Sequence, residues 1–451
     1  MIRKLGEIFA EWAKRYVPHP FIFALMLTFL TIALGMALTP SSFFDMIAHW
    51  EQGFWDLLTF SMQMCLILVT GHALATSGPA RRLIERLADL PKSPRGMVAV
   101  VGCVTGAAAI LNWGLGLIIG ALLAKEMGKS AERRGVRAHY PLLGAAGYME
   151  LLVWHGGLSG SAPLLIATPA HFLESEIGVI PISETLFSCL NIVTTPCLLL
   201  AAIGVLVLMT PHESDSVGAS RFLRAVSRAG ENPATRTDTP RPRYFAKRLE
   251  NSMWPSVIVG LMGLGYVGYF FYANGFDLNL NILNFMFLFL GVLLHRTPAN
   301  YVDAIDEAAR SCSAIILQFP FYSGIMGMMR LSGLAGVMAG WFVAVSNSTT
   351  YPVFTFLSAG LVNLFVPSGG GQWAVQGPIM VGTAIKMGIP LPKIVLALAY
   401  GDQWTNMLQP FWALPLLGIT GLEARDIVGY TMTVMLLTGL VILSALLLVP
   451  V

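Results

Sequence analysis

The residues best suited to chemistry lie in one polar, glycine-rich run within an otherwise apolar chain. From Asn363 to Pro378 the sequence reads Asn-Leu-Phe-Val-Pro-Ser-Gly-Gly-Gly-Gln-Trp-Ala-Val-Gln-Gly-Pro. At membrane depth, backbone without helical hydrogen bonds is tolerated only where protein or a water-filled cavity covers it. The run is therefore a candidate binding site. The substrate-binding residues predicted in it are Asn363, Ser368, Gly369, Gly370, Gly371 and Gln372.

A matching break interrupts the apolar segment 97–124 in the first half of the chain. Asn112, Trp113 and Gly114 lie at its centre, and we expect all three to bind substrate. A broken helix presents N-terminal N–H groups with partial positive charge, which suits an anion. Because neither polar run contains Lys or Arg, the anion would be held by backbone dipoles and neutral side chains. The alternative is a glycine-rich kink that only lets helices pack closely.

Two further apolar segments contain polar breaks. Residues 154–163 are too rich in glycine for a continuous helix, and residues 403–412 combine Gln, Asn and Thr with Trp and Phe. Hydroxyls, amides and carbonyls beside aromatic faces suit a small carboxylate with an apolar tail. The alternative is aromatic packing around a proline kink. The substrate-binding residues predicted in these segments are Ser159, Ser161 and Gln409.

Ionisable residues inside membrane spans are costly, so they are functional candidates by default. Glu150, His155 and Asp402, together with Asn406, form the predicted site for a coupling ion or proton. Glu150 and Asp402 are the leading pair because they occupy related positions in the two halves. The alternative is that these carboxyl groups are structural and bond to backbone or water. The cation would be H⁺ or Na⁺, and apart from bound Na⁺ no cofactor is predicted.

The composition places these residues in a membrane protein. Of 451 residues, 55% are hydrophobic and 12% are charged, and the mean hydropathy is +0.68. Soluble domains carry about 25% charged residues, so this chain needs lipid to cover its apolar surface. We therefore predict an all-α polytopic membrane protein. The sequence has no phosphate-binding loop, dinucleotide fingerprint, metal-ligand cluster or Ser-His-Asp order, so neither an enzyme nor a nucleic-acid partner is expected.

Most apolar stretches are near the length of about 20 residues that crosses the hydrocarbon core. Lys and Arg gather in cytoplasmic loops, which puts the N-terminus on the cytoplasmic side of the membrane and the C-terminus on the opposite side. This topology leaves only Arg330, Lys386 and Lys393 of 28 basic residues outside. The predicted spans are 20–39, 57–75, 141–168, 184–209, 253–273, 280–295, 311–329, 394–419 and 427–449.

Segments 97–124 and 352–385 are predicted to be re-entrant hairpins. Basic residues flank 97–124 on one predicted face, and its 28 residues are too few for two crossings of a core about 30 Å thick at about 1.5 Å per residue. The first hairpin would enter from the inside, with its tip at residues 112–116. The second would enter from the outside, with its tip at residues 367–371.

The two halves of the chain repeat each other, and Asn112 at the first tip corresponds to Asn363 near the second. Tyr148 and Tyr400 are each followed by an acidic residue at the second position and by Pro-Leu-Leu from the fifteenth. Two matching halves in opposite orientation, each with a broken segment, are typical of secondary transporters. The predicted organisation is an interfacial amphipathic helix (1–19), a first membrane repeat (20–210), a basic cytoplasmic linker (211–252), an extra transmembrane helix (253–279) and a second membrane repeat (280–451).

These motifs resemble the bacterial short-chain fatty acid transporter family, which includes acetoacetate and butyrate carriers. The resemblance covers nearly the whole chain apart from the linker. It rests on Val69-Thr70-Gly71-His72-Ala73-Leu74-Ala75, Asn112-Trp113-Gly114, Ser159-Gly160-Ser161 with Pro163-Leu164-Leu165, Gln318-Phe319-Pro320-Phe321-Tyr322, Val366-Pro367-Ser368-Gly369-Gly370-Gly371 and Gln409-Pro410-Phe411-Trp412-Ala413-Leu414-Pro415.

The resemblance implies uptake of short-chain monocarboxylates such as acetoacetate or butyrate across the bacterial inner membrane, so that the predicted N-terminus lies in the cytoplasm and the C-terminus in the periplasm. It also implies kinship with ion-coupled carriers of the ion transporter superfamily, which use paired hairpins, often as homodimers with a moving, elevator-type transport domain. Moving a monocarboxylate into an inside-negative cell costs about 2.3 kcal/mol per 100 mV. Concentrative uptake therefore requires a co-transported cation, and we expect an H⁺- or Na⁺-coupled symporter that works by alternating access.

Two other functions stay open from the sequence. A Na⁺-coupled dicarboxylate carrier would use the same architecture, although two carboxylates need more hydrogen-bonding groups or a cation than these Trp-rich tips offer. A membrane-embedded acyl-modifying enzyme would need a His–carboxylate pair within reach of its substrate.

Overall fold

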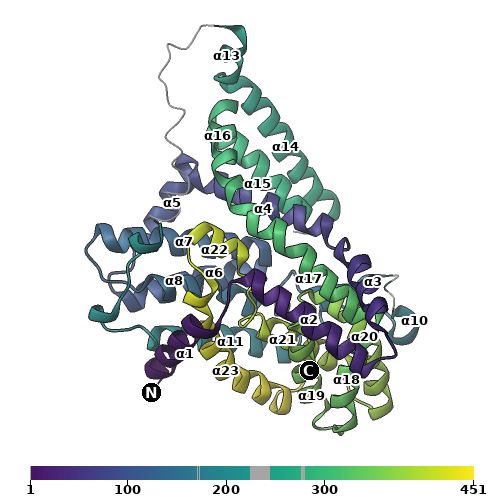
Figure 1. Cartoon of the computed structure of the whole chain (residues 1–451). Coiled ribbons are helices and arrows are strands. Elements are labelled where there is room, and N and C mark those ends of the chain that lie inside the picture. The colour runs from purple at the N-terminus through teal and green to yellow at the C-terminus, as the bar shows by residue number, and fades with distance from the viewer. Residues whose placement is uncertain (1, 170, 172, 224–243, 276–279) are drawn as a thin grey trace.

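The computed structural model describes residues 2–169, 171, 173–223, 244–275 and 280–451. The regular structure in these residues is entirely helical, with no strand among them, so the predicted all-α class is confirmed within this part of the chain. The helices form two groups. In Figure 1 the first group runs from the top of the view down across its middle, and the second lies in the lower half. We call them the upper bundle and the hairpin body.

The upper bundle contains seven helices. They are α2 (Pro20–Leu38), α3 (Phe43–Phe54), α4 (Leu58–Thr76), α14 (Met253–Asn274), α15 (Leu280–His295), α16 (Pro298–Ala309) and α17 (Ser313–Leu331). α17 packs along α2 and α3, and α15 packs between α4 and α14. Where α3 crosses α17, Gly53 faces Gly327, and the two backbones touch because neither residue has a side chain.

The hairpin body contains both glycine-rich runs. Its helices are α1 (Ile2–Tyr16), α6 (Pro94–Leu111), α7 (Trp113–Arg133), α8 (Tyr140–Gly147), α9 (Ser161–Ile166), α11 (Cys189–Leu208), α19 (Tyr351–Asn363), α20 (Gly369–Met387), α21 (Leu391–Thr405), α22 (Leu414–Thr420) and α23 (Ala424–Leu448). α6 packs against α7, and α19 packs against α21. Short helices join these elements: α5 (Gly78–Asp89), α10 (Glu174–Ile177), α13 (Phe245–Glu250) and α18 (Leu334–Ala344).

Apolar helices occur where the sequence predicts spans. Among the described residues, five helices are long and apolar enough to cross a membrane, namely α2, α6, α11, α14 and α23. α17 and α18 meet the same criterion together as a pair bent by 61°, and α4 and α15 contain shorter apolar helices. The chain is therefore a multi-pass membrane protein.

The two spans predicted to be broken are broken. After α8 the chain makes 3₁₀ turns at Met149–Leu152 and Trp154–Gly156 before α9 begins. α21 ends at Thr405, and α22 begins only at Leu414. Within the first interruption Gly157 is required, because an added Cβ would lie 2.6 Å from the carbonyl oxygen of Ile110.

Both predicted hairpins fold as helix pairs, but the arms of the first are longer than predicted. α6 and α7 contain 18 and 21 residues, whereas the sequence predicted about 10–15 per arm. α7 continues past Lys125 and Lys129 because lysine favours a helix nearly as well as leucine does. α6 is long and apolar enough to cross the core. The argument that segment 97–124 is too short for two crossings is therefore wrong. Re-entry of this hairpin stays a prediction. α19 and α20 form a helix pair at the place of the predicted second hairpin, and its re-entry also stays a prediction.

Six described α-helices lie where the sequence predicted only connections or the linker. They are α3, α5, α10, α13, α16 and α18. α3 has a readable start signal, because Ser42 and Asp45 form a capping box in which each side chain bonds to the other's backbone N–H. Because one face of α3 is polar, a search for apolar spans does not detect this helix.

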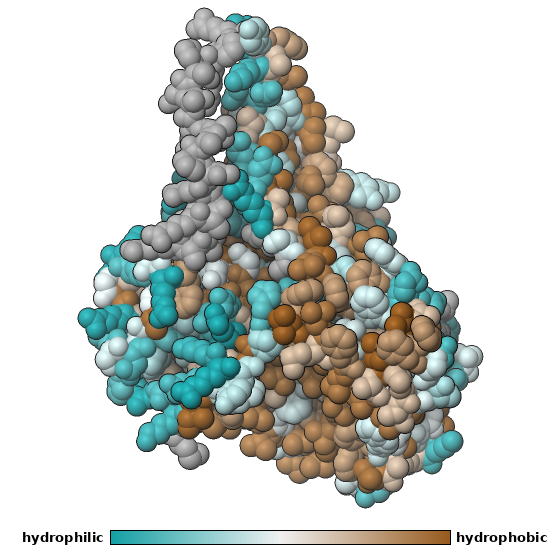
Figure 2. Space-filling model, in the orientation of Figure 1, coloured by the Kyte–Doolittle hydropathy of each residue, from teal (hydrophilic) through white to brown (hydrophobic). Residues whose placement is uncertain are grey.

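Two contacts on the described surface join residues that the topology predicts to lie on the same side of the membrane. Arg330 and Asp56, both predicted outside, form an ion pair at 2.6 Å. Arg134 Nη1 donates to the carbonyl oxygen of Pro91 at 2.9 Å, and both are predicted inside. In Figure 2, hydrophilic residues gather where Figure 1 places α1, α5 and α7, while a broad hydrophobic surface covers the region of α2 and α17.

The predicted linker 211–252 is described only at its two ends. Residues 224–243, which carry most of its arginines, lie outside the described residues. The described start of the linker is hydrogen-bonded to the buried side chain of His139, the residue before α8. Val217 N donates to His139 Nδ1 at 3.2 Å, so the neutral ring carries its proton on Nε2 and donates it to Tyr430 Oη at 2.9 Å.

Acidic pH should weaken these hydrogen bonds of His139. Burial, with a smaller contribution from Lys14, lowers the pKa of His139 from its ordinary 6.5 to about 4. The neutral ring therefore stabilises the fold fully above pH 6.5, and this stability is lost as the pH falls from 6.5 to about 4, by about 3 kcal/mol in total.

Thermal unfolding of the detergent-purified protein from about pH 7.5 to about pH 4.5 measures this effect. In His139→Asn the amide oxygen still accepts from Val217 but does not titrate. We expect a flatter pH dependence for this variant than for the wild type, and equal slopes would contradict the assignment.

Candidate functional site

The first hairpin turns at Asn112, which ends α6 and caps α7. Its backbone is extended (φ −159°, ψ 130°), and its Oδ1 accepts a hydrogen bond from Leu115 N at 3.1 Å. This cap satisfies one of the free N–H groups at the start of α7. Trp113 N donates to Ser159 Oγ at 3.0 Å. Three predicted substrate-binding residues, Asn112, Trp113 and Ser159, thus also hold the tip in shape.

The second hairpin turns at Ser368, which caps α20. Its Oγ accepts from Gly371 N at 3.2 Å. The structural counterpart of Asn112 is therefore Ser368, whereas the sequence matched Asn112 to Asn363, which ends α19. Gln372 braces α20 against α19, because its Nε2 donates to the carbonyl oxygen of Ala359 at 2.7 Å.

Both tips lie against the interruption between α8 and α9, residues 154–161, which we call the first break. From the first hairpin, the carbonyl oxygen of Ile110 accepts from Leu158 N at 2.7 Å. From the second hairpin, Gly369 approaches so closely that an added Cβ would lie 2.8 Å from His155 Cε1. Gly370 lies beside Ser161. The structure thus brings the two predicted tips to a single segment.

A buried His–carboxylate pair joins the two halves of the chain at this place. His155 Nδ1 lies 3.4 Å from Asp402 Oδ1, and the two residues are 0% and 1% exposed. His155 Nε2 accepts from Ala162 N at 3.1 Å, so the proton of the neutral ring lies on Nδ1 and faces Asp402. His155 N also donates to Gln403 Oε1 at 3.0 Å. The sequence predicted both members as ion-site residues but related Asp402 to Glu150.

Asn363 joins the second hairpin to the interruption between α21 and α22, residues 406–413, which we call the second break. Its Nδ2 donates to the carbonyl oxygen of Asp402 and to Asn406 Oδ1, both at 2.8 Å, and to Thr405 Oγ1 at 3.0 Å. Gln409 Nε2 donates to the carbonyl oxygen of Asn363. The predicted residues Asn363, Asp402, Asn406 and Gln409 therefore form one buried network.

Two buried tyrosines cross between the halves. Tyr148 Oη donates to two carbonyl oxygens of the second break, each at 3.0 Å. Tyr400 Oη donates to Asn191 Oδ1 at 2.9 Å, and Asn191 Nδ2 donates to the carbonyl oxygen of Gly156 in the first break at 2.8 Å. Each tyrosine thus supports the break of the other half. The sequence analysis used these tyrosines as repeat markers but missed this role, which their equal offsets from the breaks could have indicated.

A row of aromatic rings leads from the tips to the upper bundle. The ring of Trp113 lies 5.4 Å from that of Trp412 and 6.3 Å from that of Trp154, measured between centroids. The Phe411 ring lies 5.0 Å from Trp412 and stacks on Phe319 of α17 at 4.3 Å. These rings provide the apolar surface that the sequence predicted beside the polar groups.

Several buried polar atoms around the two breaks have no hydrogen-bond partner within the described part of the protein. Leaving such a group unpaired costs about 1–3 kcal/mol, so these atoms are places where water, an ion or a substrate would bind. Oxygens suit a cation, and N–H groups suit a carboxylate. The oxygens are Asn363 Oδ1, Gln372 Oε1, Asp402 Oδ2 and Gln409 Oε1, and the nitrogens are Trp154 Nε1, Gln403 Nε2 and Asn406 Nδ2.

Glu150 stands apart from the His–carboxylate pair. It lies in a 3₁₀ turn, is 0% exposed, and neither of its carboxyl oxygens has a partner among the described residues. The described contacts do not join it to Asp402, whose Oδ1 faces His155. A lone charge at such a position costs several kcal/mol, which a bound proton or cation removes.

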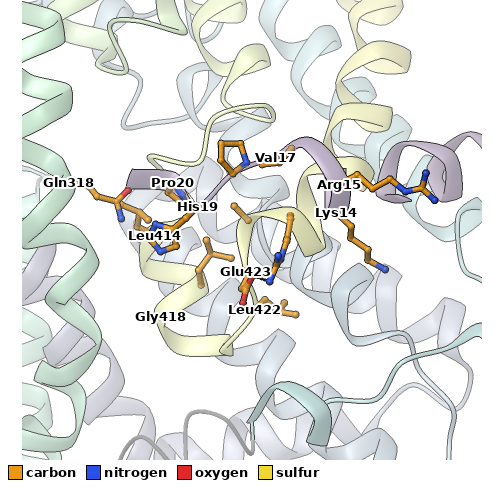
Figure 3. A pocket seen from close by; sticks show the side chains of 14 residues that line it. Lys14, Arg15, Val17, His19, Pro20, Gln318, Leu414, Gly418, Leu422 and Glu423 are labelled. Atoms are coloured by element: carbon orange, nitrogen blue, oxygen red, sulfur yellow. Dashed lines mark ion pairs between the residues drawn. The ribbon is translucent and has the colours of Figure 1, made fainter. Parts of the chain in front are cut away.

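A cavity of the described residues lies elsewhere. It has a volume of about 590 Å³ and lies among the α1–α2 connection, α17, α22 and the start of α23 (Figure 3). None of the residues that line it belongs to a hairpin tip. The tips themselves are closely packed, and no group of three or more His, Cys, Asp or Glu gathers within the described ranges.

The packing of the second tip gives a matched pair of substitutions. In Gly369→Ala the new methyl group would lie 2.8 Å from His155 Cε1 and 2.9 Å from the Trp154 ring. In Gly370→Ala the nearest atoms are 3.7 and 4.0 Å away, which is ordinary contact. We expect Gly369→Ala to cost about 1–3 kcal/mol and to lower the unfolding temperature in detergent, while Gly370→Ala unfolds near the wild-type temperature. Equal unfolding temperatures for the two variants would contradict this packing.

Comparisons with solved structures give weak likenesses over nearly the full chain. The YdaH transporter of Alcanivorax borkumensis has a TM-score of 0.41 and 15% identity, with 95% of this chain and 97% of that chain covered. MtrF of Neisseria gonorrhoeae, described as one of a class of antimetabolite efflux pumps, has a TM-score of 0.38 and 14% identity, with 96% of each chain covered. Neither likeness is close enough to support an argument about this chain.

Sequence comparison is decisive. The model of the short chain fatty acid transporter family matches residues 1–449. A protein of Escherichia coli (strain K12), provisionally named a short-chain fatty acid transporter, is 43% identical over 441 residues, 98% of each chain. A Haemophilus influenzae (strain ATCC 51907 / DSM 11121 / KW20 / Rd) protein with the same provisional name is 41% identical over 446 residues, 97% of this chain and 98% of the relative. The chain therefore belongs to the short-chain fatty acid transporter family.

Proposed function

We propose that this protein imports short-chain monocarboxylates, such as acetoacetate or butyrate, together with H⁺ or Na⁺. The observation that carries the proposal is the meeting of two helix starts and two broken spans at one buried cluster. That cluster contains the His155–Asp402 pair and several polar atoms without a protein partner. Ligand sites at the midplane of broken helices are the arrangement that secondary transporters use.

The substrate carboxylate would bind at the starts of α7 and α20. No Lys or Arg is buried among the described residues, so the available partners are backbone N–H groups and amide donors. Gln403 Nε2 and Asn406 Nδ2 are such donors, and neither has an acceptor among the described residues. The helix dipoles add partial positive charge at the same places. The aromatic row around Trp113 and Trp412 would cover the short aliphatic tail.

The coupling cation would bind at Asp402. Two like charges about 7 Å apart repel by about 2 kcal/mol at an effective dielectric constant of about 20, so a charged Asp402 opposes the substrate carboxylate. A proton on the His155–Asp402 pair would remove this repulsion. So would Na⁺, for which Asn363 Oδ1, Asp402 Oδ2 and Gln409 Oε1 are the hard oxygen ligands without a protein donor. Cation and anion then bind cooperatively, which couples their transport.

We further propose two inverted repeats with re-entrant hairpins and elevator-type alternating access. Each half has a helix pair followed by a broken span, and Tyr148 and Tyr400 support the opposite breaks in a reciprocal manner. The hairpin body meets the upper bundle mainly where α4 contacts α7 and where α17 contacts α18 and α22. A boundary this narrow suits a hairpin body that slides across the membrane with the bound substrate.

The proposal includes a homodimer in the bacterial inner membrane, with the N-terminus in the cytoplasm and the C-terminus in the periplasm. α14 supports a contact with lipid or a second copy, because its outward face is apolar. The exposed side chains on it include Trp254, Ile258, Met262 and Tyr269. The basic loops described above support the orientation.

The alternatives from the sequence are less well supported. A dicarboxylate would need a second charged or hydrogen-bonding partner, and the described site holds no buried Lys or Arg to supply one. The family consists of transporters, so the His155–Asp402 pair is not interpreted as the acid–base pair of an acyl-modifying enzyme.

Asp402 should be required for concentrative uptake but not for exchange. In Asp402→Asn the neutral amide mimics the cation-loaded carboxyl group. We therefore expect butyrate accumulation in proteoliposomes under a pH or sodium gradient to fall by about tenfold or more, while butyrate–butyrate exchange persists. Asp303→Asn, on the exposed surface of α16, is the matched control. Full accumulation by Asp402→Asn would exclude Asp402 as the coupling site, and wild-type uptake that ignores both gradients would exclude coupling itself.

Glu150 should set the pH dependence of transport if it binds a proton. Glu150→Gln keeps the shape of the protonated side chain, so its uptake at acidic pH should equal that of the wild type. As the pH rises and Glu150 loses its proton, butyrate uptake by the wild type should depart from its value at acidic pH. Uptake by Glu150→Gln should keep that value. The exposed Glu51→Gln change in α3 is the control. Parallel pH profiles for wild type and Glu150→Gln would show that Glu150 is structural.

A further inference from the structure

The cavity of about 590 Å³ lies on the boundary between the upper bundle and the hairpin body (Figure 3). α17 contributes Gln318 from the upper bundle, and α22 contributes Leu414, Leu417 and Gly418 from the hairpin body. The connection between α1 and α2 closes a third side, with Val17 to Pro20. A space between two groups of helices would change shape when one group slides past the other.

The rim of the cavity is basic. Lys14, Arg15 and Arg425 line it, and Glu423 is the acidic residue among the described lining, paired with Arg425 at 2.5 Å. Figure 3 shows Lys14 and Arg15 at one end of the cavity and Gln318 at the other. α2 begins at Pro20 on the same rim, and the dipole of this helix adds partial positive charge there. The rim therefore attracts an anion.

The floor of the cavity is apolar apart from one amide. Leu414, Leu417 and Leu422 line it. Gln318 is 1% exposed, and its Oε1 has no partner in the described part of the protein. A basic rim above an apolar floor fits a small molecule that has a carboxylate head and a short aliphatic tail.

The floor also leads toward the hairpin tips. The residue after Gln318 is Phe319, whose ring stacks on Phe411 at 4.3 Å. Phe411 contacts Trp412 at 5.0 Å, and Trp412 contacts Trp113 at the first tip at 5.4 Å. One row of packed rings thus separates the cavity from the proposed substrate site.

We propose that this cavity is a second carboxylate site, an exit vestibule in which Lys14, Arg15 and Arg425 hold the monocarboxylate after it leaves the hairpin tips. The predicted topology places these residues on the cytoplasmic side. The inference rests on the proposed function, because it takes the transported monocarboxylate as the ligand. A phospholipid headgroup shares the same charge. The unpaired Gln318 and the ring row favour the substrate, since they lead inward to its site.

The test compares the two faces of the membrane. [¹⁴C]butyrate exchange in proteoliposomes is measured with substrate varied on the face that carries α1 and then on the opposite face, and cleavage of an N-terminal tag assigns the faces. The Lys14→Gln/Arg15→Gln double variant should raise the KM on the α1 face by about fivefold and leave the opposite KM and the maximal rate unchanged. Lys4→Gln, an equal charge change on the exposed part of α1, should match the wild type. Gln318→Leu should raise the same one-sided KM without a change of charge.

Each further result decides between the explanations. Unchanged KM values on both faces in the double variant, with normal wild-type exchange, would overturn the vestibule and leave the proposed function standing. Wild-type protein that exchanges no butyrate would overturn the proposed function itself. If the effect of the double variant appears in liposomes with anionic phospholipid and disappears in purely zwitterionic liposomes, the basic rim binds lipid headgroups and the inference is wrong.

Discussion

The structure depends on one constraint: every break in a membrane helix leaves backbone N–H and C=O groups that lipid cannot satisfy, so protein or a water-filled cavity must do so. Here each break is satisfied partly within its own half and partly by the other half of the chain. Tyr148 bonds to carbonyl groups of the second break, while Tyr400 reaches the first break through Asn191. Gln403 accepts from the backbone of His155. The two breaks therefore stabilise each other where they are in contact, and this contact also forms the candidate site.

The charge pattern of the site follows from the same geometry. Helix starts supply partial positive charge, but the ionisable groups buried with them are two carboxyl groups and a histidine, Asp402, Glu150 and His155. An anion is thus attracted by dipoles and repelled by any carboxylate that stays charged. This opposition makes a bound cation part of the anion site, without any need for a lysine or arginine. It also separates this centre from the basic rim at the α1–α2 connection, where full positive charges face water.

The sequence predicted the class, the spans, both interruptions and most residues that meet at the centre, because glycine, proline and buried charge are visible in a hydrophobic chain. The sequence did not predict which residues contact one another. Asp402 was related to Glu150 by its position in the repeat, whereas in space it faces His155. Asn112 was matched to Asn363, whereas the second cap is Ser368. Helix lengths failed for a related reason, since the first Lys after an apolar run marks the edge of the lipid and not the end of α7. Pairing and helix ends depend on neighbours distant in sequence.

The reciprocal bonding of the two tyrosines has a consequence for biogenesis. The first half of the chain is synthesised and inserted first, and at that stage the Tyr148 hydroxyl and the His155 N–H have no partners, because Asn406, Gln409 and Gln403 do not yet exist in the membrane. The polar groups of the first break must therefore be shielded from lipid by an insertion factor or by water until the second half is inserted. A product truncated before Tyr400 would keep unpaired polar backbone in lipid, the kind of defect that membrane quality control removes.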